Sequence, residues 1–273
     1  MIKKILISIF LVISLNANEL LNQKIENFIG TQNYLTHKNL INFIFKKEYQ
    51  YTTVDGLNYQ TILKTLKDNG LLNLAFNNPK NIEVTFKINS NPVKSFKILK
   101  DTLKSLGYYY YFTKHTIYDG TESLTWTIKL KTEAAIDPLV LSNELFQHDC
   151  RVLDITKENN DKWTYELDTT NASLFDATYI TNNEKVSFSK PLSPYFIRVD
   201  KASKIYIVSR TLNRWLPYVV FYDEHLNILK VSKEEKVYRN ITLSIPENTK
   251  YIKITDLYTL FNIKRGLSVL IKE

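Results

Sequence analysis

Side chains with metal-binding or nucleophilic chemistry are few in this 273-residue sequence. Glu144 and His148 stand four residues apart in a predicted helix, with Asp149 next to them, so a carboxylate and an imidazole could share one face and hold a metal ion. The same spacing is common in surface ion pairs, and this is the interpretation we adopt. Cys150, the single cysteine, begins a predicted strand and is expected to be a buried, inert thiol.

Motifs of the common enzyme classes are absent. The sequence contains no G-x-S-x-G, G-x-G-x-x-G, Walker A, H-E-x-x-H or C-x-x-C motif. One cysteine also excludes an intramolecular disulfide and a zinc site built from several thiolates. An envelope hydrolase would need an acid–base pair, and the sequence does not locate one. We therefore predict a protein that is not an enzyme, with no catalytic residues, no cofactor and no metal site.

Aromatic residues form a first candidate surface. The run Tyr108–Phe112, with sequence YYYYF, places aromatic side chains on both faces of a predicted strand, whereas a half-exposed strand needs them on only one. The second face is expected to pack beneath the N-terminal helices. The alternative is a partner surface, for which Tyr109 and Tyr111 are the candidate contact residues.

A loop between two predicted strands forms a second candidate site. It combines Arg, Asn, Trp and Tyr, and sugars are bound by aromatic rings together with directed hydrogen bonds from such polar side chains; protein interfaces use the same residue types. The candidate glycan contacts are Arg210, Asn213, Arg214, Trp215 and Tyr218. The alternative interpretation is that Trp215 fills one end of a hydrophobic core.

The N-terminus has the pattern of a secretory signal peptide. A short basic start is followed by an apolar run over residues 5–15 and by Asn16-Ala17, after which cleavage is expected. A membrane-spanning helix needs about 20 apolar residues, and this run is shorter. We predict a periplasmic protein with no transmembrane segment in its mature form, or an extracellular one as second choice. An uncleaved membrane anchor is the alternative.

The charge of the chain does not indicate a nucleic-acid partner. Lys and Arg number 36 against 28 Asp and Glu, which gives a formal charge of +8. The lysines are scattered, with no arginine-rich stripe and no aromatic motif of an RNA-binding sheet. A predicted helix carries four lysines on one face, which we interpret as solvated: Lys94, Lys97, Lys100 and Lys104.

Residues 18–78 are predicted to be a helical region that packs on the next domain. Apolar residues recur at helical spacing in three segments. Gly30 is expected to end the first helix, Thr36 to cap the second and Asp55 to cap the third.

Residues 79–170 are predicted to fold in the order β-α-β-β-α-β with one added strand. The expected strands are 82–88, 108–113, 124–130, 151–156 and 162–167. Asn91-Pro92 and Asp137-Pro138 each have the cap residue and proline of a helix start. This order is typical of a ferredoxin-like, split βαβ domain, in which an antiparallel sheet carries two helices on one face.

Residues 171–273 are predicted to form an all-β sandwich, because turn signals separate short strands about every ten residues. The segments 204–209 (KIYIVS), 219–224 (VVFYDE) and 243–254 (LSIPENTKYIKI) resemble the jelly-roll β-sandwich modules that often occur as carbohydrate-binding or accessory domains. The resemblance covers about 100 residues and implies a fold more than a ligand.

The sequence thus predicts an α+β N-terminal part, with short helices and a ferredoxin-like domain, followed by a jelly-roll-like β-sandwich. The function expected from the signal peptide and the missing catalytic motifs is that of a structural or docking component of a periplasmic assembly, such as a motility, secretion or cell-wall apparatus. Its partners would be other envelope proteins. The alternative is a protein that binds polysaccharide or peptidoglycan through the C-terminal sandwich.

Overall fold

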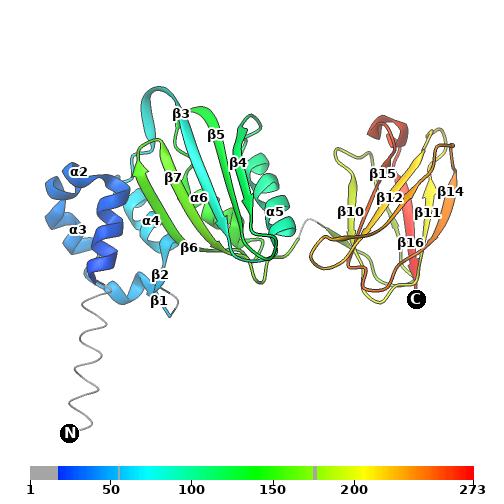
Figure 1. Ribbon diagram of the computed structural model, residues 1–273, viewed down its shortest axis with the longest axis horizontal. Helices are drawn as coiled ribbons and strands as arrows, with labels where there is room; N and C mark the ends of the chain where they lie inside the picture. Colours follow the sequence, from blue (N-terminus) through cyan, green and yellow to red (C-terminus); the bar gives the residue numbers. More distant parts are fainter. Residues whose placement is uncertain (1–17, 55, 175–176) are drawn as a thin grey trace, which may run out of the picture. The chain divides into compact units, whose positions relative to one another are not determined.

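A computed structural model describes residues 18–54, 56–174 and 177–273 of the chain (Figure 1). The chain divides into two compact units, one ending at Ser173 and one running from Leu174 to Glu273. The first is α+β, and the regular elements of the second, within the described residues, are strands and one short 3-10 helix. The predicted signal peptide, residues 1–17, lies outside the described residues. Within the described part of the chain, no helix is both long enough and apolar enough to span a membrane.

The helical region of the first unit begins with a predicted helix, and the short helix α2 that follows it was not predicted. Residues 18–29 are helical, and Gly30 ends this helix, as expected, with a φ of 84°. Its remaining elements are α2 (Thr31–Thr36), α3 (Lys38–Ile44), η1 (Glu48–Gln50), β1 (Thr52–Thr53), β2 (Gly56–Leu57) and α4 (Tyr59–Asp68).

Two helices begin at other N-cap residues than predicted: α3 at His37, which makes no side-chain cap, and α4 at Asn58. Thr36 is the last residue of α2, where its hydroxyl donates to the Gln32 carbonyl, so the prediction that it caps the second helix was wrong. Asp55 lies outside the described residues. The helix that it was expected to cap begins four residues later, and the side chain of Asn58 accepts the Thr61 N–H at 3.1 Å. The apolar residues that recur at helical spacing in α4 are all buried: Tyr59, Ile62, Leu63 and Leu66.

The rest of the first unit is a five-stranded sheet with two helices, and Figure 1 shows both helices on one face of the sheet. Its elements are β3 (Ala75–Ile88), α5 (Pro92–Ser105), β4 (Phe112–Tyr118), β5 (Leu124–Ala134), α6 (Pro138–Phe146), β6 (Arg151–Asn159) and β7 (Lys162–Asp168). The strand order is β4-β5-β3-β7-β6. The sheet is mixed rather than antiparallel, because β7 inserts beside β3 in parallel orientation and leaves β6 at the edge.

The alternation of apolar residues in β3 places the core of the first unit between sheet and helices. Ile82, Val84, Phe86 and Ile88 are buried. The Phe86 ring stacks on Trp126 and on Tyr165, with centroids 5.7 Å apart in both pairs. Phe96 of α5 meets Trp126 edge-on at 4.8 Å and so joins the helix to the sheet. This core fixes the sheet and therefore its two edges.

The two helices that begin with proline, α5 and α6, differ in how their first turn is capped. Asp137 caps α6 as predicted, because its carboxylate accepts the N–H groups of Leu139 and Val140. Asn91 makes no side-chain cap and has a φ of 49°. Its carboxamide instead donates to the carbonyls of Thr169 and Thr170, so it joins the start of α5 to the end of β7.

Two predicted orientations in the helices were wrong. Lys94 is only 4% exposed, because α5 packs against α6 as well as the sheet, so the predicted solvated lysine face does not include it. Lys97 does lie at the surface, in an ion pair with Asp101. The apolar pattern of residues 138–146 also predicts that Phe146 faces inward, but at the end of α6 its side chain is more than half exposed.

The second unit consists of two sheets that enclose one core. The strand orders are β13-β12-β15-β10-β8 and β14-β11-β16-β9. Short strands separated by turns recur along this region, as the sequence predicted. The elements are β8 (Thr178–Tyr179), β9 (Lys185–Ser187), β10 (Tyr195–Arg198), β11 (Lys204–Ser209), β12 (Pro217–Tyr222), β13 (Ile228–Lys233), β14 (Asn240–Ser244), β15 (Tyr251–Asp256), η2 (Leu260–Ile263) and β16 (Leu267–Lys272).

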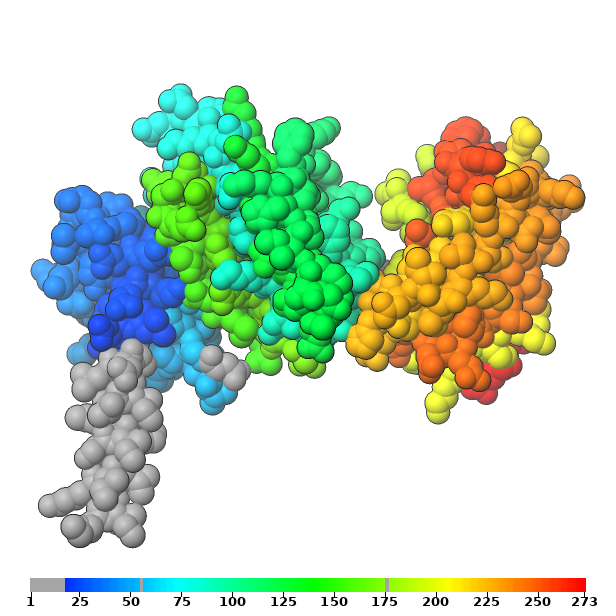
Figure 2. Space-filling model, viewed as in Figure 1, coloured from blue at the N-terminus to red at the C-terminus, as the bar shows by residue number. Residues whose placement is uncertain are grey.

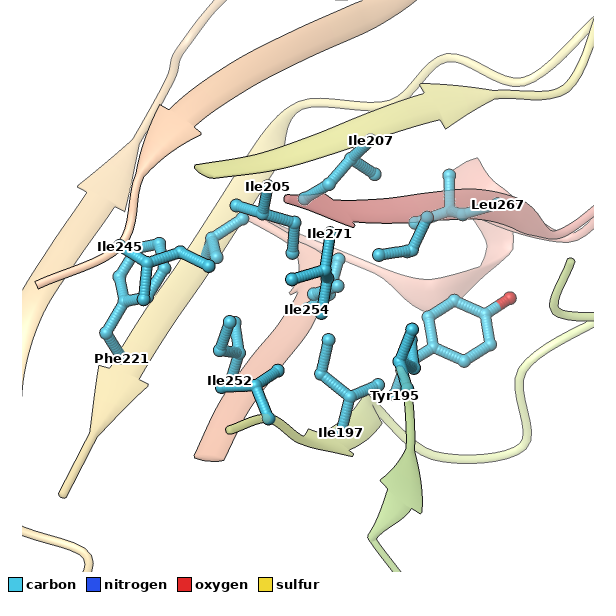
Figure 3. Close-up of a cluster of buried hydrophobic side chains, with 14 of the residues drawn as sticks. Tyr195, Ile197, Ile205, Ile207, Phe221, Ile245, Ile252, Ile254, Leu267 and Ile271 are labelled. Atoms are coloured by element: carbon cyan, nitrogen blue, oxygen red, sulfur yellow. The ribbon is translucent and has the colours of Figure 1, made fainter. Parts of the chain in front are cut away.

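The core of the second unit is built from branched aliphatic side chains of both sheets. Figure 3 shows Ile197, Ile252 and Ile254 of one sheet facing Ile205 and Ile271 of the other, and all five are fully buried. β-Branched residues suit this position because they pack well on a pleated surface.

Candidate functional site

One edge of the first unit's sheet, the strand β6, is closed by the N-terminal helix. The Asn27 carboxamide accepts a hydrogen bond from the Lys157 N–H at 2.9 Å and donates one to the Lys157 carbonyl at 2.7 Å. Lys24 donates to the Ile155 carbonyl at 3.2 Å. These side chains supply the bonds that a further strand would make, so this edge cannot accept one there. Figure 2 shows the blue atoms of the helices against the lime-green atoms of the β6–β7 region.

A carboxylate fixes the same junction. Asp154 of β6 accepts from the Tyr59 hydroxyl and forms an ion pair with Lys24 at 2.6 Å. Burial acts to raise the pKa of Asp154, but hydrogen bonds from Lys24, Tyr59 and Thr156 outweigh it, so the pKa is lowered. Burial, followed by the bond to Asp154, strongly raises the pKa of Tyr59. Asp154 is therefore held as an anion, and Tyr59 as a neutral hydrogen-bond donor.

The opposite edge of the sheet, β4, is open. All seven residues of β4 are exposed, and in the described structure no strand pairs with its outer side. The exposed fraction is 92% for Tyr110, 81% for Phe112 and 63% for Tyr109. Together with Ile117 and Tyr118, which are also exposed, these residues form what we call the β4 edge surface.

This arrangement overturns the expectation that the aromatic run packs beneath the N-terminal helices. Those helices contact β6, and four strands separate β6 from the outer side of β4. Figure 1 shows the helices and β4 at opposite edges of the sheet. The aromatic side chains on β4 therefore face outward.

The two predicted contact residues behave differently. Tyr109 is exposed, whereas Tyr111 packs edge-on against Trp126 with ring centroids 5.7 Å apart, and burial raises its pKa. The predicted strand started four residues too early, because residues 108–111 follow Gly107 without regular structure and β4 begins at Phe112. Alternation counted from Tyr108 thus selected Tyr111 and missed Tyr110 and Phe112. The positive φ that Gly107 adopts is the local signal of this irregularity.

Polar contacts hold β4 in place on the sheet face away from the helices. His115 Nε2 lies 2.9 Å from the Thr127 hydroxyl, which in turn lies 2.9 Å from that of Thr85. Lys114 forms an ion pair with Glu83 at 2.8 Å, and this hydrogen bond lowers the pKa of Glu83. β4 is thus anchored through its side chains and through β5, while its outer side bears none of these contacts.

The loop predicted to bind glycans has its tryptophan inside the core. Trp215 is fully buried, and its indole N–H donates to the Thr255 carbonyl at 2.9 Å. Asn213 donates to the Gly266 carbonyl at 2.9 Å and accepts from the Arg265 N–H at 3.1 Å. The alternative interpretation of Trp215, a core residue, thus matches its position.

The other predicted glycan contacts do not form a common binding surface with the buried Trp215. Arg210 and Arg214 are exposed, and Tyr218 is half-buried with the Lys253 ammonium 5.8 Å from its ring. The predicted set therefore gives no exposed tryptophan face on which a sugar could stack.

The candidate metal and thiol residues have structural contacts. Glu144 accepts from the Ser105 hydroxyl at 2.9 Å, and His148 Nδ1 lies 3.1 Å from the Ser173 carbonyl. Among the described residues, no group of three or more His, Cys, Asp and Glu could hold a metal ion. Cys150 lines a pocket of about 360 Å³ between α4, α6 and β6, but burial raises its pKa to about 12. The thiolate needed for nucleophilic chemistry is therefore scarce near neutral pH.

Comparison with known proteins identifies no relative: no family model matches the sequence, and no curated protein resembles it significantly.

Proposed function

We propose that this protein is a structural docking component of an exported assembly and that it binds a partner protein through the β4 edge surface. The observation that carries the proposal is the contrast between the two sheet edges. One is closed by Asn27 and Lys24, while the other is left open and carries exposed aromatic side chains. Exposed edge strands are usually blunted or covered, and exposed aromatic residues are enriched in interfaces.

We place the protein in the periplasm, or as second choice outside the cell. Support for export comes from the basic start and apolar run of residues 1–17. A docking role is consistent with the positions of His148 and Cys150, which are buried, and with Glu144, which bonds Ser105 of the neighbouring helix.

We also propose fold types for the two units. The first would be a ferredoxin-like domain with an inserted strand, since β5 lies between β3 and β4 as in a split βαβ unit and β7 is the addition. The second would be a jelly roll. Support comes from the order of its strands. β9, the first strand of more than two residues, lies beside the last strand, β16, and β11 lies between β16 and β14; the facing sheet has the order β13-β12-β15-β10-β8.

The proposal is tested by mild crosslinking and pull-down of the tagged protein from its own envelope. Tyr110→Ser and Phe112→Ser should reduce recovery of stoichiometric partner proteins at least fivefold, with an unchanged melting temperature. Tyr49→Ser is the matched control, because Tyr49 is 71% exposed but lies in η1, outside the β4 edge surface. Equal recovery with all three variants would contradict the proposal.

The same experiment separates this function from glycan binding. Retention on cell-wall or polysaccharide material, with no stoichiometric protein partner, would favour the alternative function. The burial of Trp215 removes the side chain on which that alternative mainly depended.

A further inference from the structure

We propose that the partner adds an extended, acidic segment of another protein to the sheet as a sixth strand beside β4. This inference rests on the proposed docking function and specifies its mode and the chemistry of the partner. In strand addition, main-chain hydrogen bonds supply affinity and the side chains of the added strand supply specificity.

The backbone of β4 is suited to this mode. The backbone of β4 is hydrogen-bonded to β5 on its inner side. On its outer side, the N–H and C=O groups make no backbone hydrogen bond to another element in the described structure. A strand of seven residues spans about 23 Å, so a segment of five to seven residues could pair along it. At the other edge, Asn27 already occupies the Lys157 N–H and C=O. Strand addition is therefore blocked at this part of β6, whereas no such contact blocks it along β4.

Charge near β4 defines the chemistry of the added segment. Lys129 of β5 is the register partner of Phe112, and Lys131 follows two residues later; both are exposed. Among the described residues, neither has a carboxylate within ion-pair distance, because Glu83, the nearest acidic residue in register, is bonded to Lys114. Glu or Asp side chains of an added strand could reach these ammonium groups, since both partners are long and flexible.

A second copy of this chain fits less well. β4 itself, with the sequence FTKHTIY, carries no acidic side chain, so a second copy paired through β4 would offer Lys129 and Lys131 no carboxylate. Two copies would also repel each other, because the chain without the predicted signal peptide, which holds two lysines and no acidic residue, has a net charge of 8 − 2 = +6. In a segment that alternates acidic and apolar residues, the acidic side chains would share the sheet face of Phe112 and its register partner Lys129. The apolar ones would lie on the other face, beside the exposed Tyr118, the register partner of the buried Leu124.

Amide hydrogen exchange of the purified protein tests this inference. The probe is a heptapeptide of alternating Val and Glu with blocked ends, and the control peptide has Lys in place of Glu. The Val/Glu peptide should slow exchange at alternate amides of β4 at least tenfold, while the Lys157 amide, already bonded to Asn27, should not change. The Val/Lys peptide should leave β4 unaffected at the same concentration.

A charge-reversal pair provides the matched variants. Lys129→Glu should weaken binding of the Val/Glu peptide at least fivefold. Lys236→Glu, an exposed lysine of the second unit, should not. Both substitutions lie on the surface, so folding is expected to be preserved.

Three outcomes would overturn the inference: no slowing at β4 with millimolar peptide, equal slowing by the Val/Lys peptide, or concentration-dependent protection of β4 in the protein alone, which would identify a second copy as the occupant. If Tyr110→Ser still reduces partner recovery in the envelope experiment, docking through side chains holds and only strand addition fails. If recovery is also unchanged, the proposed function fails as well.

Discussion

The side chain of Asn27 forms a two-point hydrogen-bonded pair with the backbone of Lys157, accepting from its N–H and donating to its carbonyl. A primary amide has the same donor and acceptor as a peptide group, so Asn27 takes the place of one residue of a neighbouring strand. Closure of this edge leaves β4 as the only open edge of this sheet in the described residues.

Removing this pair should destabilise the first unit. Asn27→Ala leaves the Lys157 N–H and C=O without their protein partner, and we expect a loss of about 1–3 kcal/mol in the free energy of unfolding. Urea denaturation measures it, with Gln23→Ala, an exposed neighbour on the same helix, as control. The opened edge should also raise aggregation. Equal stability of the two variants would show that the pair contributes nothing.

Acid should weaken the junction between the helices and β6. The pKa of Asp154 is lower in the folded state than its ordinary value of 3.8, so the unfolded chain binds the proton more readily. The stabilising contribution of Asp154 is therefore complete above the ordinary pKa and is lost as the pH falls through the lower, folded-state pKa.

Asp154→Asn should accordingly reduce stability at neutral pH and flatten the fall in stability below about pH 4, the ordinary range of an Asp carboxyl. The measurement is the melting temperature of wild type and variant between pH 2.5 and 7. Lys64 and Asp68 form an exposed i,i+4 pair, so Asp68→Asn is the control and should change the profile little. Parallel profiles for wild type and Asp154→Asn would contradict the assignment.

Trp215 should be required for folding of the second unit rather than for sugar binding. Trp215→Ala removes a fully buried indole and its bond to Thr255, which should cost about 3–5 kcal/mol. Near-ultraviolet circular dichroism and thermal unfolding measure the loss. Tyr258→Ala, at 73% exposure in the same unit, should be nearly neutral. A well-folded Trp215→Ala protein that no longer binds polysaccharide would revive the glycan hypothesis.

Two glycines with nearly equal φ angles should respond differently to substitution by alanine. Gly266 has a φ of +90°, and an added Cβ would lie 2.0 Å from the Phe188 carbonyl oxygen. Gly120 has a φ of +87° with open space around the same position. Gly120→Ala should cost about 1–2 kcal/mol from the left-handed conformation alone. Gly266→Ala should cost clearly more, and similar losses in chemical denaturation would rule out the steric contribution.

The amino-acid sequence by itself determined the type and face of most elements. Alternation over residues 82–88 predicted the buried side of β3, and Asp137-Pro138 predicted the capped start of α6. The short strands of the second unit were also predicted from their turns. These features depend on neighbouring residues in the chain, so local periodicity and capping chemistry are sufficient to predict them.

Tertiary structure alone decided which strands are neighbours and what covers each side chain. The insertion of β7 beside β3 made the sheet mixed and placed β6 under the N-terminal helices. The same sheet order left the aromatic residues of β4 outside, while packing between two sheets enclosed Trp215. A period of two shows that a strand has two faces, but it does not show which edge pairs with what. That choice depends on contacts between residues far apart in sequence, and these contacts define the candidate site.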